Sequence, residues 1–149
     1  MKLSTKGRYG LRCMVDLTIH SDEEKVSLCN IAQRQGISEN YLEQVFATLR
    51  KTGLVKSIKG AQGGYVLAKE PSKITVGTIL RALEGELVII DAQDERNDSR
   101  AQAMKDCIKA HVWDKINQNI NKLVDSITLK DLADDCRKRN SADTLMYHI

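Results

Sequence analysis

The chain has 149 residues, enough for one hydrophobic core and an appendage, and it contains no apolar run long enough to cross a bilayer. Its formal net charge of +3 permits nucleic-acid binding without requiring it, although basic residues clearly outnumber acidic ones over residues 1–73. The first residues lack the apolar core of a signal peptide, so we expect a cytoplasmic protein with no membrane partner. The four cysteines include no CxxC pair, so we expect no structural disulfide.

Two helices are predicted before residue 36. Residues 6–20 carry apolar side chains along one side, as expected for a helix that packs on a core. Ser27 is placed to cap a second, shorter helix that runs to Gln35, and Gly36 is placed to end it. The three residues 36–38 then give the turn length that a helix-turn-helix requires.

The second helix of this motif is predicted over residues 39–51, with Ser38 as its N-cap and Gly53 as the left-handed residue past its end. Its apolar residues share one stripe by their i, i+3, i+4, i+7 spacing: Leu42, Val45, Phe46 and Leu49. Its remaining face is rich in amides, hydroxyls and charge: Glu39, Asn40, Tyr41, Glu43, Gln44, Thr48, Arg50 and Lys51. Such a helix is suited to reading a surface.

A β-hairpin is predicted next, with strands over 54–58 and 65–67 and a glycine-rich turn over 60–64. A helix followed by a basic hairpin is the plan of a winged helix-turn-helix, and Lys56 and Lys59 are placed to meet phosphates. The fold class expected is therefore mainly α with a small β-hairpin.

The tip of the hairpin has two interpretations. The glycine pair Gly63 and Gly64 is needed for a simple hairpin turn. Gln62 at the tip, with basic residues beside it, instead favours a wing that reaches into a minor groove. We favour the wing.

The outer face of the second helix is where base edges would be read. Gln44 can pair with adenine, whereas Glu43 can accept from cytosine N4 and repels phosphate, so it disfavours wrong sequences. Tyr41 is a further candidate for base contact. Ser38 and Asn40, near the start of the helix, are better placed for phosphates.

After the hairpin, Thr75 is placed to cap a helix that Gly85 ends. Residues 91–100 have no apolar periodicity and are expected to form a mobile loop. A long helix then begins near Ala101, with an apolar residue every three to four positions: Met104, Ile108, Val112, Ile116, Ile120, Leu123 and Ile127. This helix either lies across the domain or, as we favour, crosses a second copy so that the two bury each other's stripes.

A short helix with a capping box is predicted from Thr128, followed by a loosely held tail. The predicted organisation therefore has four parts. They are a winged helix-turn-helix domain (1–85), a sensor loop (86–100), a dimerisation helix with the short helix after it (101–137), and a tail (138–149).

A resemblance to a known family rests on three segments. The opening KLSTKGRYGLR and the stretch IAQRQGISENYLEQVFATLRKTGLVKSIKGAQGGYVLAKEPSKITVGTILRALEG closely resemble the IscR, NsrR and CymR group of bacterial winged-helix repressors. CIKAHVWDKINQNINKLVDSITLKDLADDC resembles the dimerisation helix of that group and the short helix after it. The resemblance implies a homodimeric transcription regulator that binds double-stranded operator DNA and is not an enzyme. It also implies backbone contacts from the first segment, at Lys6, Arg8 and Tyr9.

Many members of that group hold a [2Fe–2S] or [4Fe–4S] cluster with three cysteines. Cys107 stands where the last of these is expected, but Ala92 and Ala101 occupy the other two positions. One thiolate cannot hold a cluster that needs about four protein ligands, so no cofactor is expected in this chain; a [2Fe–2S] cluster is implied only with cysteines at 92 and 101. His111, one turn after Cys107, is a candidate fourth ligand, although the resemblance implies a histidine at the position of Ala110.

Two explanations of these alanines are open. One explanation is that the chain is a cluster sensor whose ligands are replaced by alanine, which traps an apo regulator of iron–sulfur biogenesis or of a related redox or nitric-oxide response. Alternatively, it is a cluster-free repressor of cysteine metabolism, controlled by a metabolic-enzyme partner or by thiol chemistry. We favour the first explanation because both positions hold alanine while Cys107 is retained.

Overall fold

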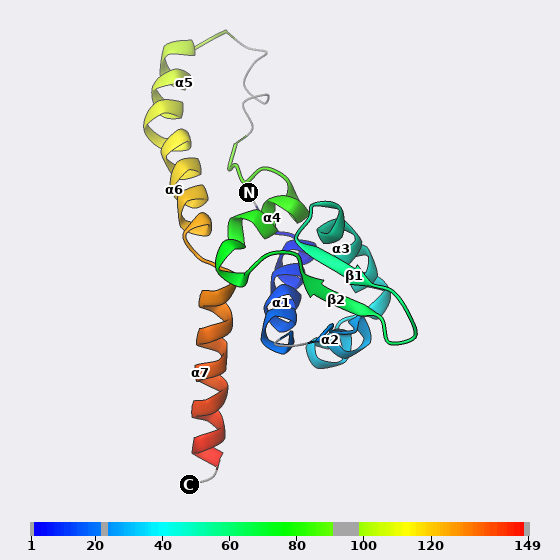
Figure 1. Cartoon of the computed structure of the whole chain (residues 1–149). Helices are drawn as coiled ribbons and strands as arrows, with labels where there is room; N and C mark the ends of the chain where they lie inside the picture. The colour runs from blue at the N-terminus through cyan, green and yellow to red at the C-terminus, as the bar shows by residue number, and fades with distance from the viewer. Residues whose placement is uncertain (1, 22–23, 91–98, 148–149) are drawn as a thin grey trace.

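The computed structural model describes residues 2–21, 24–90 and 99–147, and it shows a winged helix-turn-helix followed by long C-terminal helices (Figure 1). The predicted fold class, mainly α with one small antiparallel hairpin, is confirmed. In chain order the elements are α1 (Thr5–His20), α2 (Leu28–Gln35), α3 (Glu39–Lys51), β1 (Val55–Ile58), β2 (Gly64–Leu67), η1 (Pro71–Lys73), α4 (Val76–Glu84), α5 (Gln102–Ile108), η2 (Lys109–Trp113), α6 (Asp114–Asp125) and α7 (Leu129–Tyr147).

The helix-turn-helix is built from two helices with the predicted caps. The Ser27 hydroxyl accepts the backbone N–H of Asn30, and Gly36 ends α2 with a left-handed φ of 65°. The Ser38 hydroxyl then accepts the N–H of Tyr41 and starts α3. Because these caps satisfy backbone groups at both helix ends, the turn between α2 and α3 is fixed by local chemistry.

The main core lies between the first three helices and the hairpin. The predicted stripe of α3 is fully buried: Leu42, Val45, Phe46 and Leu49. Met14 and Leu17 of α1 and Ile31 of α2 are also fully buried in this cluster. A second, smaller cluster joins α4 to α6, with Val76 and Leu80 at its centre. The core therefore packs the face of α3 opposite to the one predicted to read DNA.

The long helix predicted from Ala101 is present as α5, η2 and α6, which extend away from the winged helix-turn-helix in Figure 1. Its central turn, η2, is a π-helical turn that the sequence did not indicate. Only the end of this helix packs on α4, through Ile120, Val124 and the following Ile127. Its upper part therefore does not lie across the domain.

The last helix, α7, is longer than predicted. We expected a short helix and a loosely held tail from Lys138, whereas α7 continues to Tyr147. The predicted capping box is present, since Thr128 and Asp131 exchange side chain-to-backbone hydrogen bonds. Ion pairs four residues apart then support the helix: Lys130–Asp134 and Asp135–Arg139. No glycine or proline interrupts residues 129–147, so nothing in this stretch ends the helix early.

The loop predicted over 91–100 falls, for residues 91–98, outside the described residues. Ser99 and Arg100 are exposed and not helical. In the described ranges, every helix is too short or too polar to span a bilayer.

Candidate nucleic-acid interface

The outer face of α3 presents the predicted base-reading side chains to solvent. Asn40, Glu43 and Gln44 are exposed, as are Ser38 at the start of the helix and Arg50 in its last turn. A polar, exposed face backed by a fully buried stripe is the arrangement that a recognition helix needs in a major groove. The structure therefore brings these five candidates together on one surface.

Tyr41 differs from the other predicted contacts on α3. Its side chain is half-buried, and its ring packs edge-on against Tyr9 of α1, with ring centroids 6.2 Å apart and planes at 84°. The guanidinium of Arg12 lies 5.0 Å from the centroid of the Tyr9 ring and donates to the carbonyl of Gln35 at 3.1 Å. The two tyrosines therefore join α1 to α3 as packing residues, which the outward assignment of Tyr41 missed.

An ion pair between the buried carboxylate of Asp16 and the exposed Arg34 holds α2 against α1. The carboxylate of Asp16 is 1% exposed and accepts from Arg34 Nε at 3.0 Å and Nη2 at 2.7 Å, and from Gln35 Nε2 at 2.7 Å. Burial opposes ionisation of Asp16, but the hydrogen bonds from Arg34 and Gln35 outweigh it, so the pKa of Asp16 lies below its usual value. This pair fixes α2, and through the capped turn it fixes how α3 is presented.

The wing carries Lys56, Lys59 and Gln62 on exposed positions, as predicted. β1 and β2 pair in an antiparallel register that places Ile58 opposite Gly64. Basic and amide side chains on a projecting hairpin are suited to phosphate and minor-groove contact.

The two glycines of the wing serve close backbone contacts. A Cβ on Gly64 would lie 2.6 Å from the carbonyl oxygen of Val26, because Val26 exchanges hydrogen bonds of 2.9 and 2.8 Å with the neighbouring Tyr65. A Cβ on Gly63 would lie 2.7 Å from the carbonyl oxygen of Ile58. The glycines are therefore required for anchoring the wing as well as for turning it.

The N-terminal candidates lie on the first turns of α1. Arg8 is exposed, whereas Lys6 and Tyr9 are half-buried. The helix is capped by Ser4, whose hydroxyl accepts from the N–H of Gly7 at 3.4 Å. Lys6 and Arg8 thus start from a capped helix end, where their positions are set by the packing of α1.

The donor set does not fit an iron–sulfur cluster. Cys107 on α5 and His111 in η2 are exposed, and Ala101, immediately before α5, has a left-handed φ of 54°. The expected ligand position of Ala92 lies outside the described residues. Within the described ranges, no three His, Cys, Asp or Glu side chains are grouped to hold a metal ion. Alanine has no ligating atom, so Cys107 supplies the one thiolate among the three expected positions.

The other cysteines are separate from this region. Cys13 is fully buried in the core, and burial raises its pKa to about 12. Cys29 on α2 is exposed, and Cys136 on α7 is half-buried. Among these, the thiol of Cys13 is held protonated and inert by its surroundings.

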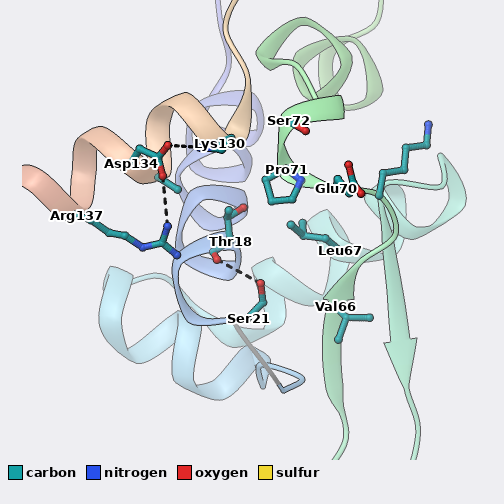
Figure 2. Close-up of a pocket in the computed structure, with 12 residues that line it drawn as sticks. Thr18, Ser21, Val66, Leu67, Glu70, Pro71, Ser72, Lys130, Asp134 and Arg137 are labelled. Carbon is teal, nitrogen blue, oxygen red and sulfur yellow. Dashed lines mark hydrogen bonds and ion pairs between the residues drawn. The ribbon is translucent and has the colours of Figure 1, made fainter.

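A pocket of about 650 Å³ lies between the end of α1, the segment after β2, and α7 (Figure 2). None of the predicted site residues lines it. On the α7 side, Asp134 pairs with Lys130 at 2.6 Å and with Arg137 at 3.6 Å. Thr18 on its wall donates to the carbonyl of Met14 at 2.7 Å. These groups are therefore already partnered within the protein.

The Rrf2 family model, described as an iron-dependent transcriptional regulator, matches residues 3–135. The HTH-type transcriptional regulator CymR of Bacillus subtilis is 44% identical over 133 residues, covering 89% of this chain and 90% of that protein. IscR of Serratia proteamaculans is 38% identical over 135 residues, covering 91% and 80%.

Two solved structures show the same similarity to both kinds of regulator. The structure of CymR, the global cysteine regulator of B. subtilis, matches with a TM-score of 0.75 at 44% identity, over 90% of this chain and 97% of that one. The structure of T. potens IscR matches with a TM-score of 0.70 at 48% identity, over 91% and 88%. Regulators of both kinds therefore resemble this chain over nearly its whole length.

Proposed function

This chain belongs to the Rrf2 family of DNA-binding transcriptional regulators and is not an enzyme, and from that premise we propose that it is a homodimeric repressor of a specific double-stranded operator. The observation that carries this proposal is the exposed polar face of α3 beside a basic wing. In this assignment α3 reads base edges in the major groove, while the wing and the first turns of α1 contact the backbone.

Two substitutions test the base-reading assignment, because one should change sequence preference and the other should change affinity for all sequences. Gln44→Ala removes an amide that pairs with one base, so we expect a loss of about 1–3 kcal/mol at one operator position and relaxed preference there. Lys59→Ala removes a phosphate contact, so it should weaken specific and random duplexes alike. Affinity for single-base operator variants, measured by fluorescence anisotropy, checks both. An unchanged operator preference in Gln44→Ala would show that α3 is wrongly assigned.

The dimer is supported by apolar side chains that the single chain leaves in solvent. They lie along α5, η2 and α6: Met104, Ile108, Val112 and Leu123. The side chains of Met104 and Leu123 are 66% and 61% exposed, which is high for large apolar side chains. A second copy that crosses this helix would bury the stripe, and the symmetry of the dimer would present two α3 helices to two half-sites.

Placing a charge in this stripe is expected to separate the dimer. Val112→Asp would bury a carboxylate between two apolar faces, so we expect a monomer at micromolar concentration. Gln118→Asp, on an exposed polar position of the same long helix, is the matched control and should remain dimeric. Sedimentation equilibrium measures both. A dimeric Val112→Asp would place the interface elsewhere.

The signal is the finer part of the proposal. We infer that the chain as it stands works without a cluster, because the cluster positions offer one thiolate. The retained Cys107, with alanine at both other positions, favours an apo regulator of iron–sulfur biogenesis or of a related redox response. The incomplete ligand set and the likeness to CymR favour the second candidate, a cluster-free repressor of cysteine metabolism.

A further inference from the structure

The last turn of α4 is hydrogen-bonded to the first turn of α1, although the two are 80 residues apart in sequence. One carboxylate oxygen of Glu84, Oε1, accepts the backbone N–H of Ser4 at 3.0 Å and that of Gly7 at 2.9 Å. The Ser4 hydroxyl donates to the same oxygen. Glu84 therefore accepts the Ser4 N–H and shares the Gly7 N–H with the Ser4 hydroxyl, and its charge suits the positive end of the helix.

Two glycines on α1 make this approach possible. A Cβ on Gly7 would overlap Glu84 Oε1, and a Cβ on Gly10 would overlap Leu83 Cδ1. Glycine inside a helix is unfavourable by about 1 kcal/mol relative to alanine. The packing of α4 therefore gives a physical reason for both glycines, which helix propensity does not.

The same end of α4 is fixed to the long helix. Asn121 Nδ2 donates to the carbonyl of Leu87 at 2.9 Å, and the N–H of Ile89 donates to Asn117 Oδ1 at 2.7 Å. Arg81 of α4 also donates to Asn121 Oδ1, at 2.8 Å. The position of Glu84 thus depends on α6, the helix that carries the proposed dimer interface.

We propose that Glu84 is a positioning residue for DNA binding, which holds the first turn of α1 where Lys6 and Arg8 reach the DNA backbone and joins that turn to α6. This inference rests on the proposed operator binding. A carboxylate bound to the turn that carries Lys6 and Arg8 would repel DNA phosphates, so simple electrostatics says that its removal strengthens binding. A positioning role says the opposite, and the sign of the effect separates the two.

The test compares variants on a duplex that the wild-type protein selects from a random library, and on an unselected duplex, over a range of salt concentrations. Glu84→Ala is expected to weaken binding to both duplexes by about 10-fold or more at about 0.2 M salt, with a larger defect at lower salt. The slope of log affinity against log salt should fall by about 2, one phosphate contact per protomer. Glu84→Gln keeps an acceptor oxygen and should restore affinity to within about 3-fold of wild type.

Gly7→Ala provides a variant in which Glu84 is intact. The added Cβ meets the flexible end of the Glu84 side chain, so the carboxylate is displaced while α1 gains helix propensity. This folded variant should reproduce the weakened binding of Glu84→Ala. Glu86→Ala, which removes the same charge from an exposed neighbour, is the matched control and should not weaken binding.

A double-mutant cycle identifies the residues through which Glu84 acts. In a Lys6→Ala/Arg8→Ala background, Glu84→Ala should add less than about a 2-fold effect, because the contacts it positions are already absent. Additive effects, or tighter binding by Glu84→Ala, would overturn the inference while leaving operator binding intact. Failure of the wild-type protein to select any duplex would instead overturn the proposed function.

Discussion

Replacing Asp16 by alanine is expected to lower the free energy of unfolding by about 3 kcal/mol, among the largest effects of any polar substitution in this chain. Its carboxylate is 1% exposed and receives three close hydrogen bonds, from Arg34 and Gln35. Loss of this acceptor leaves their donors without a partner at the contact between α1 and α2. Urea unfolding monitored by circular dichroism measures the change.

A matched ion pair elsewhere in the molecule provides the control. Arg81 and Asp125 form two bonds of 2.8 Å, a geometry close to that of the Asp16 pair, but the Asp125 side chain is 46% exposed. Surface pairs contribute about 0–1 kcal/mol, so Asp125→Ala should cost far less than Asp16→Ala. Equal costs would show that burial does not set the strength of the Asp16 pair.

The Asp16 contribution also has a defined pH dependence. Because the pKa of Asp16 is below its unfolded value of about 3.9, its contribution to stability is present above that pH and is lost as the pH falls through the folded pKa. The stability difference between the wild type and Asp16→Ala should therefore shrink as the pH falls below about 4. A difference that persists unchanged to about pH 2 would mean that the carboxylate is not the stabilising form.

Local chemistry made much of this fold predictable. The caps at Ser27 and Ser38 and the left-handed Gly36 are encoded within a few residues, and each lies where the sequence placed it. The apolar stripe of α3 obeys helical spacing, so its buried face, and hence its outer face, followed directly. The candidate base-reading residues on that outer face could therefore be named before any coordinates.

The features that were missed depend on partners distant in sequence. Arg34 meets Asp16 across 18 residues, and Glu84 reaches Ser4 across 80. Helical periodicity shows which face a residue occupies but not which residue lies opposite. The packing of Tyr41 on Tyr9 was missed for the same reason, because Tyr9 lies on another helix. The sequence likewise contains no local signal for the π-helical turn or for the length of α7.

The variant Ala92→Cys/Ala101→Cys is expected to bind an iron–sulfur cluster after anaerobic reconstitution with iron and sulfide. With Cys107, it would present three thiolates at the positions expected from the family, leaving one further ligand to complete the set. Visible absorption together with analysis of bound iron and sulfide measures the gain. The unaltered chain, with one thiolate at these positions, should remain colourless.

Removing Cys107 from the restored protein is the decisive control. The triple variant Ala92→Cys/Ala101→Cys/Cys107→Ala has two thiolates at these positions. Two thiolates cannot hold a cluster alone, so the visible absorption of this variant should return to that of the unaltered chain. Ala101 has a φ of 54°, a conformation that costs a non-glycine residue about 1 kcal/mol or more, so a ligated cysteine at 101 should also shift the local backbone.

A restored variant that binds operator but takes up no iron would instead favour the second candidate, a cluster-free repressor of cysteine metabolism. Repression would then be controlled by a thiol, a metabolite or a partner protein, with Cys107 as an exposed thiol of α5 rather than a residual ligand.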